Sequence, residues 1–117
     1  MTRINAGIPV DQLSDKHLIA EHREIKRIPN MIFSGRAKLV GIPENFILGK
    51  GHVKFFYNKL LYLKLRYEEL YEECKRRGFN ITYFGDAWKD SKPELMNDWK
   101  PTKDSIKLIK QRIKERS

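Results

Sequence analysis

The chain has 117 residues, of which 40% are hydrophobic and 33% charged, and this composition predicts one folded domain over residues 1–117 rather than a disordered chain. The single cysteine, Cys74, excludes an internal disulfide, and three histidines without clustered cysteines argue against a metal site. No apolar stretch reaches the roughly 18 residues that span a bilayer, and the first residues lack a signal peptide. We therefore expect a cytoplasmic protein with no membrane partner.

The net charge of +9 favours a polyanionic partner such as nucleic acid. Two segments hold most of the excess: residues 31–65 contain six basic residues and one acidic residue, and residues 101–117 contain six and two. Folding can place both segments on one face. The alternative is a basic surface that serves only solubility.

The first predicted helix covers residues 14–27, with Asp11 or Ser14 as its N-cap. Apolar residues recur along it at near-helical spacing, as at Leu18 and Ile25. Pro29 is expected to end this helix, because the residue before a proline disfavours helical geometry. Residues 29–51 contain several glycines and prolines and are predicted to be mostly irregular.

The second predicted helix is the longest and covers residues 52–77. Its apolar residues step by four and three positions, which indicates one buried stripe: Phe56, Leu60, Leu63, Tyr67, Leu70 and Cys74. A long loop with at most one extra turn should follow over residues 79–101. The third predicted helix covers residues 102–116, with Thr102 as its N-cap. No segment alternates as a strand would, so the predicted fold is all-α, with three main helices and long irregular connections.

Thr2 is a candidate nucleophile. A small residue in the second position allows an aminopeptidase to remove Met1, which leaves a free α-amine on Thr2. The pKa of an α-amine is about 7.7–8.0, against about 10.4 for lysine, so at neutral pH it is deprotonated far more often. A deprotonated amine can attack an anomeric carbon and form a Schiff base. The alternative is that the amine has no role, as in most proteins that begin Met-Thr.

A second candidate group lies at the end of the first predicted helix, where Arg23, Glu24 and Arg27 follow one another closely. Arg23 and Arg27 are spaced i, i+4, so they share a helix face and can clamp a phosphate backbone. A carboxylate flanked by two guanidinium groups stays ionised near phosphates. The alternative is a solvated helix surface with ordinary ion pairs.

Several blocks of this sequence, in order, resemble the phage-type pyrimidine-dimer DNA glycosylases of the T-even endonuclease V type. The matching blocks are residues 1–5 (MTRIN), 15–24 (DKHLIAEHRE), 46–60 (FILGKGHVKFFYNKL) and 75–81 (KRRGFNI), with a weaker match at 98–101 and 105–106. The resemblance implies a three-helix domain whose N-terminal segment is packed between helices. It also implies an enzyme that needs no metal and acts on damaged double-stranded DNA. We expect it to use no cofactor and to act as a monomer.

The resemblance further implies a DNA N-glycosylase with AP lyase activity, whose catalytic residues are Thr2 and Glu24. The Thr2 amine would attack C1′ of the damaged nucleotide and displace the base. Glu24 would stabilise the cationic Schiff base and assist removal of the C2′ proton, so that β-elimination cuts the strand. The family flips a nucleotide out of a kinked duplex. The expected DNA-binding residues are Arg3, His17, Arg23, Arg27, Lys50, His52, Arg112 and Arg116.

The sequence departs from the family in ways that leave the lesion open. The family members extend beyond this C-terminus with a tail rich in tryptophan, tyrosine and lysine, and His22 stands where a tyrosine is usual. A lyase for abasic sites or for other base lesions is therefore an alternative, as is a non-enzymatic basic DNA-binding module. His52 is equally compatible with a cap or a core position. A metal-dependent nuclease is disfavoured, because no acidic cluster suggests a magnesium site.

Overall fold

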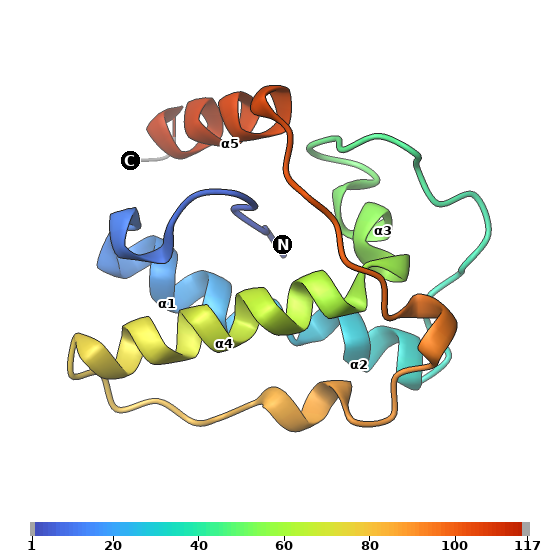
Figure 1. Ribbon diagram of the computed structural model, residues 1–117, viewed down its shortest axis with the longest axis horizontal. Helices are drawn as coiled ribbons and strands as arrows, with labels where there is room; N and C mark the ends of the chain where they lie inside the picture. The colour runs from blue at the N-terminus through green and yellow to red at the C-terminus, as the bar shows by residue number, and fades with distance from the viewer. Residues whose placement is uncertain (1, 116–117) are drawn as a thin grey trace.

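A computed structural model describes residues 2–115, which form helices joined by irregular chain (Figure 1). No strand occurs within these residues, so the all-α prediction is confirmed. The three longest helices are the three main helices that the sequence predicts. The α-helices are α1 (Asp15–Glu24), α2 (Arg27–Phe33), α3 (His52–Phe55), α4 (Leu60–Arg76) and α5 (Lys103–Glu115), and the 3₁₀ turns are η1 (Val10–Gln12), η2 (Phe56–Asn58), η3 (Gly85–Trp88) and η4 (Pro93–Leu95).

The N-terminal segment, residues 2–9, runs between helices. Figure 1 shows α4 crossing the middle of the molecule, with α1 packed along it, and α5 on the opposite side of the N-terminal segment. Ile4 and Ala6 of this segment are fully buried, and Asn5 is 4% exposed. The expectation that the N-terminal segment is packed between helices is thereby confirmed.

One hydrophobic core holds these elements together. All six residues of the predicted apolar stripe on α4 and η2 are buried, and they pack against apolar residues from the N-terminal segment, α1 and α5. Each fully buried large side chain contributes roughly 1.5–3 kcal/mol relative to an exposed one. The core therefore fixes α1, α5 and the N-terminal segment against one face of α4. None of the helices within residues 2–115 is both long enough and apolar enough to cross a membrane.

The predicted first helix is divided into two. Ser14 caps α1, accepting a hydrogen bond from the His17 backbone N–H at 3.2 Å. The helix ends at Glu24 rather than at residue 27, and α2 begins at Arg27. Pro29 does not end a helix, so that prediction is wrong. It lies in the first turn of α2, where the missing N–H would have no helical partner in any case.

The predicted second helix is also interrupted. Its first turns are α3 and η2, and the long helix α4 begins only after Lys59, whose φ of −128° and ψ of 42° are not helical. Asn97, remote in sequence, supplies hydrogen bonds at the break. Its side-chain amide donates to the Asn58 backbone carbonyl at 2.9 Å, and its backbone carbonyl accepts from the Tyr62 N–H at 3.3 Å. A tertiary contact therefore stabilises an interruption that the apolar stripe does not signal.

The chain from α4 to α5 contains two 3₁₀ turns, η3 and η4, where the sequence predicts at most one turn. Gly78 ends α4 with a φ of 83°, a left-handed conformation that favours glycine. Thr102 caps α5, because its hydroxyl accepts a hydrogen bond from the Ser105 N–H at 3.0 Å. That prediction is confirmed.

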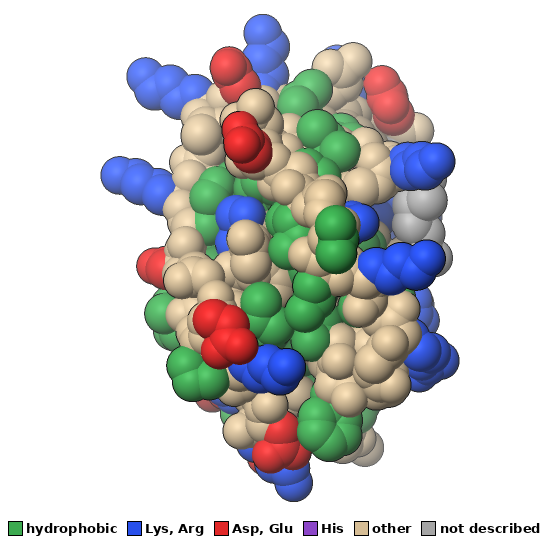
Figure 2. Space-filling model, turned by 90° about the vertical axis from the view of Figure 1, so that its right-hand side faces the viewer, with side chains coloured by type: hydrophobic (Ala, Val, Ile, Leu, Met, Phe, Trp, Pro, Cys, Tyr) green, Lys and Arg blue, Asp and Glu red, His purple; other side chains and the backbone are tan. Residues whose placement is uncertain are grey.

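The predicted irregular segment 29–51 is irregular only over residues 34–51, the connection between α2 and α3, because residues 29–33 belong to α2. It lies on the right of Figure 1 and faces the viewer in Figure 2, where hydrophobic side chains are exposed in the middle and lysine and arginine side chains project around the edges. Val40 is 84% exposed on this connection. Part of the basic segment 31–65 is therefore presented to solvent beside apolar side chains.

Candidate active site

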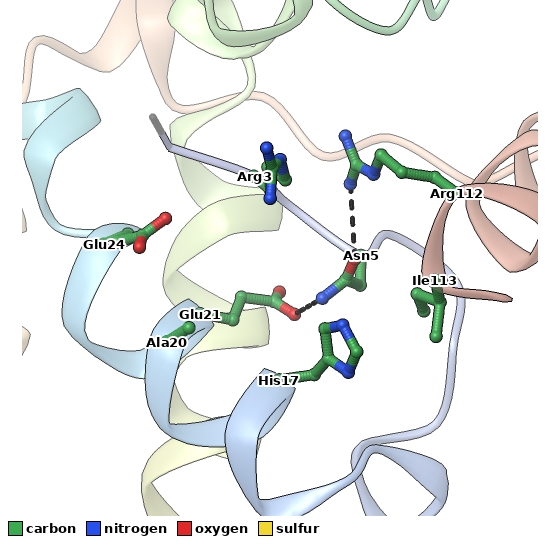
Figure 3. A pocket seen from close by; sticks show the side chains of 8 residues that line it. All are labelled: Arg3, Asn5, His17, Ala20, Glu21, Glu24, Arg112 and Ile113. Carbon is green, nitrogen blue, oxygen red and sulfur yellow. Dashed lines mark hydrogen bonds between the residues drawn. The ribbon is translucent and has the colours of Figure 1, made fainter. Parts of the chain in front are cut away.

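A pocket lies where the N-terminal segment passes between α1 and α5 (Figure 3). Four of the residues that the sequence predicts for the site, from three segments far apart in the chain, line it together. The lining residues are Arg3 and Asn5 of the N-terminal segment, His17, Ala20, Glu21 and Glu24 of α1, and Arg112 and Ile113 of α5. A groove that shares Arg3 and Arg112 with this pocket continues toward Leu48 and Gly49.

Glu24 stands at the end of α1 with its carboxylate directed toward the side of the pocket that Arg3 occupies (Figure 3). Its side chain is 14% exposed, and the Arg23 guanidinium lies 3.4 Å from it. Thr2 is half-buried and directly precedes Arg3. Because successive Cα atoms are about 3.8 Å apart, residue 2 must lie close to the same pocket.

His17 contributes a neutral ring to the pocket wall. Its pKa is lowered by burial and then by the positive charges of Lys16, Arg112 and Arg3. The Ser14 hydroxyl lies 2.8 Å from its Nδ1, which fixes the orientation of the ring. The other ring nitrogen, Nε2, can donate or accept a hydrogen bond, depending on the tautomer. His17 is therefore equipped to bind a phosphate or a sugar hydroxyl.

Three buried polar side chains hold the N-terminal segment from within, and we call Asn5, Glu21 and Arg66 the inner clamp. The Asn5 side-chain amide donates to Glu21 Oε1 at 3.0 Å. Arg66 of α4 donates to both oxygens of Glu21, at 2.8 and 3.0 Å, and to the Ile8 carbonyl at 2.6 Å. The side chains of Glu21 and Arg66 are 1% and 5% exposed. The clamp therefore ties α1, α4 and the N-terminal segment together directly beneath the pocket.

His52 supports the same segment from α3. Its Nε2 accepts a hydrogen bond from the Ile4 N–H at 3.0 Å, and its Nδ1 lies 2.9 Å from the Ile47 carbonyl, to which it donates. The ring is 2% exposed, and burial lowers its pKa to about 4. Both ring nitrogens are thus engaged with backbone. This position fits the core alternative for His52 rather than the expected DNA contact.

A comparison with known families decides which class of protein this is. The family model described as pyrimidine dimer DNA glycosylase matches residues 1–84, more than two thirds of the chain. The chain belongs to this family. It is a DNA-repair glycosylase by family, and its partner is damaged DNA. The matched range contains the N-terminal segment, α1 and α4, and hence most of the pocket.

The remaining predicted DNA contacts lie around the pocket rather than in it. Arg23 is 60% exposed in the last turn of α1, and Arg27 is exposed at the start of α2. The prediction that Arg23 and Arg27 share one helix face is wrong, because α1 ends at Glu24 and α2 begins at Arg27. Lys50 is exposed before α3. Arg116 lies outside the described residues.

Arg112 is less exposed than a DNA contact on a helix surface would be. It is 9% exposed, and its guanidinium donates to the Ile4 carbonyl at 3.3 Å and to Asn5 Oδ1 at 3.2 Å. It therefore brings positive charge to the pocket from α5 while it holds the backbone of the N-terminal segment. A phosphate or sugar oxygen in the pocket would meet this charge together with that of Arg3.

Sequence reasoning missed Asn5 and Arg66 as parts of the site. A signal for Arg66 was present: it falls three residues after Leu63 and directly before Tyr67, on the buried face of α4. A charged residue among core positions needs a buried partner. No comparable signal marks Asn5. Within residues 2–115, no three histidine, cysteine or carboxylate side chains gather as metal ligands would.

Proposed function

We propose that this protein is a bifunctional DNA glycosylase and AP lyase that acts on pyrimidine dimers in duplex DNA, with the α-amine of Thr2 as its nucleophile once Met1 is removed. The observation that carries the proposal is the pocket itself. It places the start of the N-terminal segment, through Arg3, beside the half-buried Glu24 carboxylate. Schiff-base chemistry needs an amine near a carboxylate, and the Thr2 amine directly precedes Arg3 in the chain.

The reaction follows from these two groups. The deprotonated amine attacks C1′, a new C1′–N bond forms, and the glycosidic bond to the base breaks with its electron pair. The nitrogen then loses a proton, and the sugar ring opens at the C1′–O4′ bond, with O4′ leaving as a hydroxyl, to give an iminium ion. The Glu24 carboxylate stabilises its positive charge. Loss of the C2′ proton to a base then expels the 3′ phosphate by β-elimination. Hydrolysis of the imine returns the free amine, so no metal or cofactor enters the cycle.

The basic residues around the pocket would hold the DNA backbone. Arg3, His17 and Arg112 line the pocket, whereas Arg23, Arg27 and Lys50 lie outside it. We propose phosphate contacts for the exposed ones and for Arg116, with the protein acting as a monomer. Because these contacts release counterions, DNA affinity should fall steeply as salt increases.

Trapping with borohydride tests this function. Reduction of the imine in the presence of lesion DNA should give a stable protein–DNA adduct at the N-terminal residue, identified by mass spectrometry. Three duplexes are compared: one with a cyclobutane dimer, one with an abasic site and one undamaged. Trapping on the dimer supports the proposed substrate, whereas trapping on the abasic site alone would indicate an abasic-site lyase.

Two controls separate an enzyme from a DNA-binding module. Glu24→Gln should lower the cleavage rate by roughly 10²–10⁴-fold with little change in DNA binding, since the neutral amide cannot stabilise the cation. Protein whose N-terminal amine is acetylated should bind DNA but neither cleave nor trap. Cleavage should persist in excess EDTA. Full activity of the acetylated protein would contradict the proposal.

A further inference from the structure

Two glutamates of α1, three residues apart, line the same pocket but have different surroundings. The Glu21 carboxylate accepts three hydrogen bonds, two from Arg66 and one from Asn5, and its side chain is 1% exposed. Glu24 lies 3.4 Å from the exposed Arg23 and is 14% exposed. The Glu21 carboxylate is therefore paired and fixed in place, whereas the Glu24 carboxylate faces the pocket.

Asn5 is held at both ends of its side chain. Its amide nitrogen donates to Glu21, and its amide oxygen accepts from Arg112 at 3.2 Å (Figure 3). The side chain is nearly inaccessible to solvent and bridges α1 and α5. Arg66 adds a second attachment at Ile8. The N-terminal segment therefore cannot slide along its axis without breaking charge-assisted hydrogen bonds in a dry environment.

We infer that Asn5, held by Glu21 and Arg112, is a positioning residue that sets where the Thr2 amine stands relative to Glu24. The inference rests on the proposed function and deepens it. Asn5 lies three positions after Thr2, so the amine lies within about 11 Å of a fixed point, at roughly 3.8 Å per step between Cα atoms. A misplacement of about 1 Å can slow a reaction by roughly 10²-fold, so this anchor controls the rate of attack.

The first test removes the anchor and measures imine formation directly. Asn5→Ala should lower the single-turnover rate of borohydride trapping on a saturating abasic duplex by about 10–100-fold. The dissociation constant for the duplex, measured by fluorescence anisotropy, should change less than about threefold, because Asn5 itself binds no phosphate. The matched control is Asn97→Ala, which also removes two hydrogen bonds of an asparagine amide, to the Asn58 and Glu94 carbonyls. That control should trap at the wild-type rate.

The second test distinguishes positioning from general loosening of the fold. One glycine is inserted between Thr2 and Arg3, which shifts the amine by up to about 3.8 Å. In the wild-type background the insertion should lower trapping strongly. In the Asn5→Ala background it should add less, because the side-chain anchor at residue 5 is already lost, so the two effects are not additive. Additive effects would overturn the inference.

The outcomes separate this inference from the function on which it rests. If the wild type itself gives no adduct, the proposed function fails. If the wild type is trapped and folded Asn5→Ala is trapped equally fast, only the positioning role fails. Should Asn5→Ala not fold, as judged by circular dichroism, Asn5→Ser is assayed against the same criteria, since its hydroxyl can still form one hydrogen bond in the buried site.

Discussion

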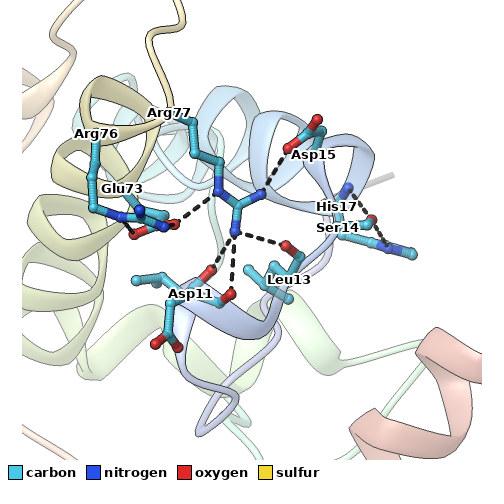
Figure 4. A network of polar contacts seen from close by, with 9 residues as sticks. Asp11, Leu13, Ser14, Asp15, His17, Glu73, Arg76 and Arg77 are labelled. Carbon is cyan, nitrogen blue, oxygen red and sulfur yellow. Dashed lines mark hydrogen bonds and ion pairs between the residues drawn. The ribbon is translucent and has the colours of Figure 1, made fainter.

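Arg66 of α4 and Arg77, the residue that follows α4, both hold the first fifteen residues of the chain, and they do so in different surroundings. Arg66 belongs to the inner clamp beside the pocket. Arg77, at the end of α4, holds the entry to α1 near the surface (Figure 4). It donates to Asp15 at 2.9 Å, to Glu73 at 2.8 Å and to the Leu13 carbonyl at 2.8 Å. We call Arg77, Glu73 and Asp15 the outer clamp.

The two clamps should therefore differ in whether their loss affects the reaction or only the stability of the fold. The inner clamp is buried, and two of its residues, Asn5 and Glu21, line the pocket, so a change there moves the N-terminal segment itself. The outer clamp fixes η1 and the start of α1, and Asp15 is 70% exposed. Hydrogen bonds from Arg76 and Arg77 lower the pKa of Glu73 to about 2, so this carboxylate stays ionised at neutral pH. We expect the outer clamp to affect folding more than catalysis.

The largest effect on stability should come from Arg66→Met. This change leaves the buried Glu21 carboxylate without its partner, and breaking such a pair typically costs about 3–5 kcal/mol. Urea unfolding at pH 7 measures the loss. Adding Glu21→Gln to this variant removes the stranded charge and should recover part of the stability. A loss below about 1 kcal/mol, or no recovery in the double variant, would show that the inner clamp is not a coupled buried pair.

The next effect is a dependence of stability on pH through His52. Burial lowers its pKa from the unfolded value of 6.5 to about 4, so the unfolded chain binds a proton more readily than the folded one. Stability is therefore complete above pH 6.5 and falls as the pH drops toward 4, by roughly 2–3 kcal/mol for this group. A protonated Nε2 can also no longer accept the hydrogen bond from the Ile4 N–H.

Comparison with His52→Gln isolates that contribution. The pKa values of His17 and His22 are also lowered by burial, and both residues are present in both proteins, so their effects cancel in the difference. Unfolding free energies measured by urea at pH 7.5 and pH 4.5 should fall further in the wild type than in the variant. If the unfolding free energy falls equally in both proteins, a group other than His52 causes the pH dependence.

Local sequence patterns predicted much of the fold. The apolar stripe from Phe56 to Cys74 and the caps at Ser14 and Thr102 rest on spacing and backbone hydrogen bonding, which are local properties. The interruptions were not predictable in this way. The break at Lys59 depends on hydrogen bonds from Asn97, and Pro29 is tolerated because α2 begins two residues earlier.

The site was predicted through family resemblance more than through spacing. Arg3, Glu24 and Arg112 come from segments that no periodicity relates, yet they line one pocket. Their roles in catalysis and DNA binding remain predictions. Burial separates His52 and Arg112 from the exposed Arg23, Arg27 and Lys50. That burial depends on tertiary packing around the N-terminal segment. The inner clamp was missed for the same reason, because its partners lie up to 61 residues apart in sequence, from Asn5 to Arg66.

A smaller effect is expected from Arg77→Met in the outer clamp. Thermal unfolding should show a lower Tm than the wild type, with a smaller fall than Arg66→Met gives, because Glu73 keeps its contact with Arg76 and the site is closer to solvent. Borohydride trapping per folded molecule should stay at the wild-type rate. A trapping defect as large as that of Asn5→Ala would show that both clamps position the amine.

The smallest effect should come from Asp15→Asn, which removes one charge from the exposed side of the outer clamp. An exposed ion pair contributes little, so we expect Tm to fall by about 2 °C or less at low salt. Because salt screens exposed charges, that difference should vanish in about 0.5 M sodium chloride. The defect of Arg66→Met should persist under the same conditions, since its carboxylate is stranded away from solvent. Equal salt sensitivity of the two variants would contradict the distinction between a dry inner clamp and a solvated outer one.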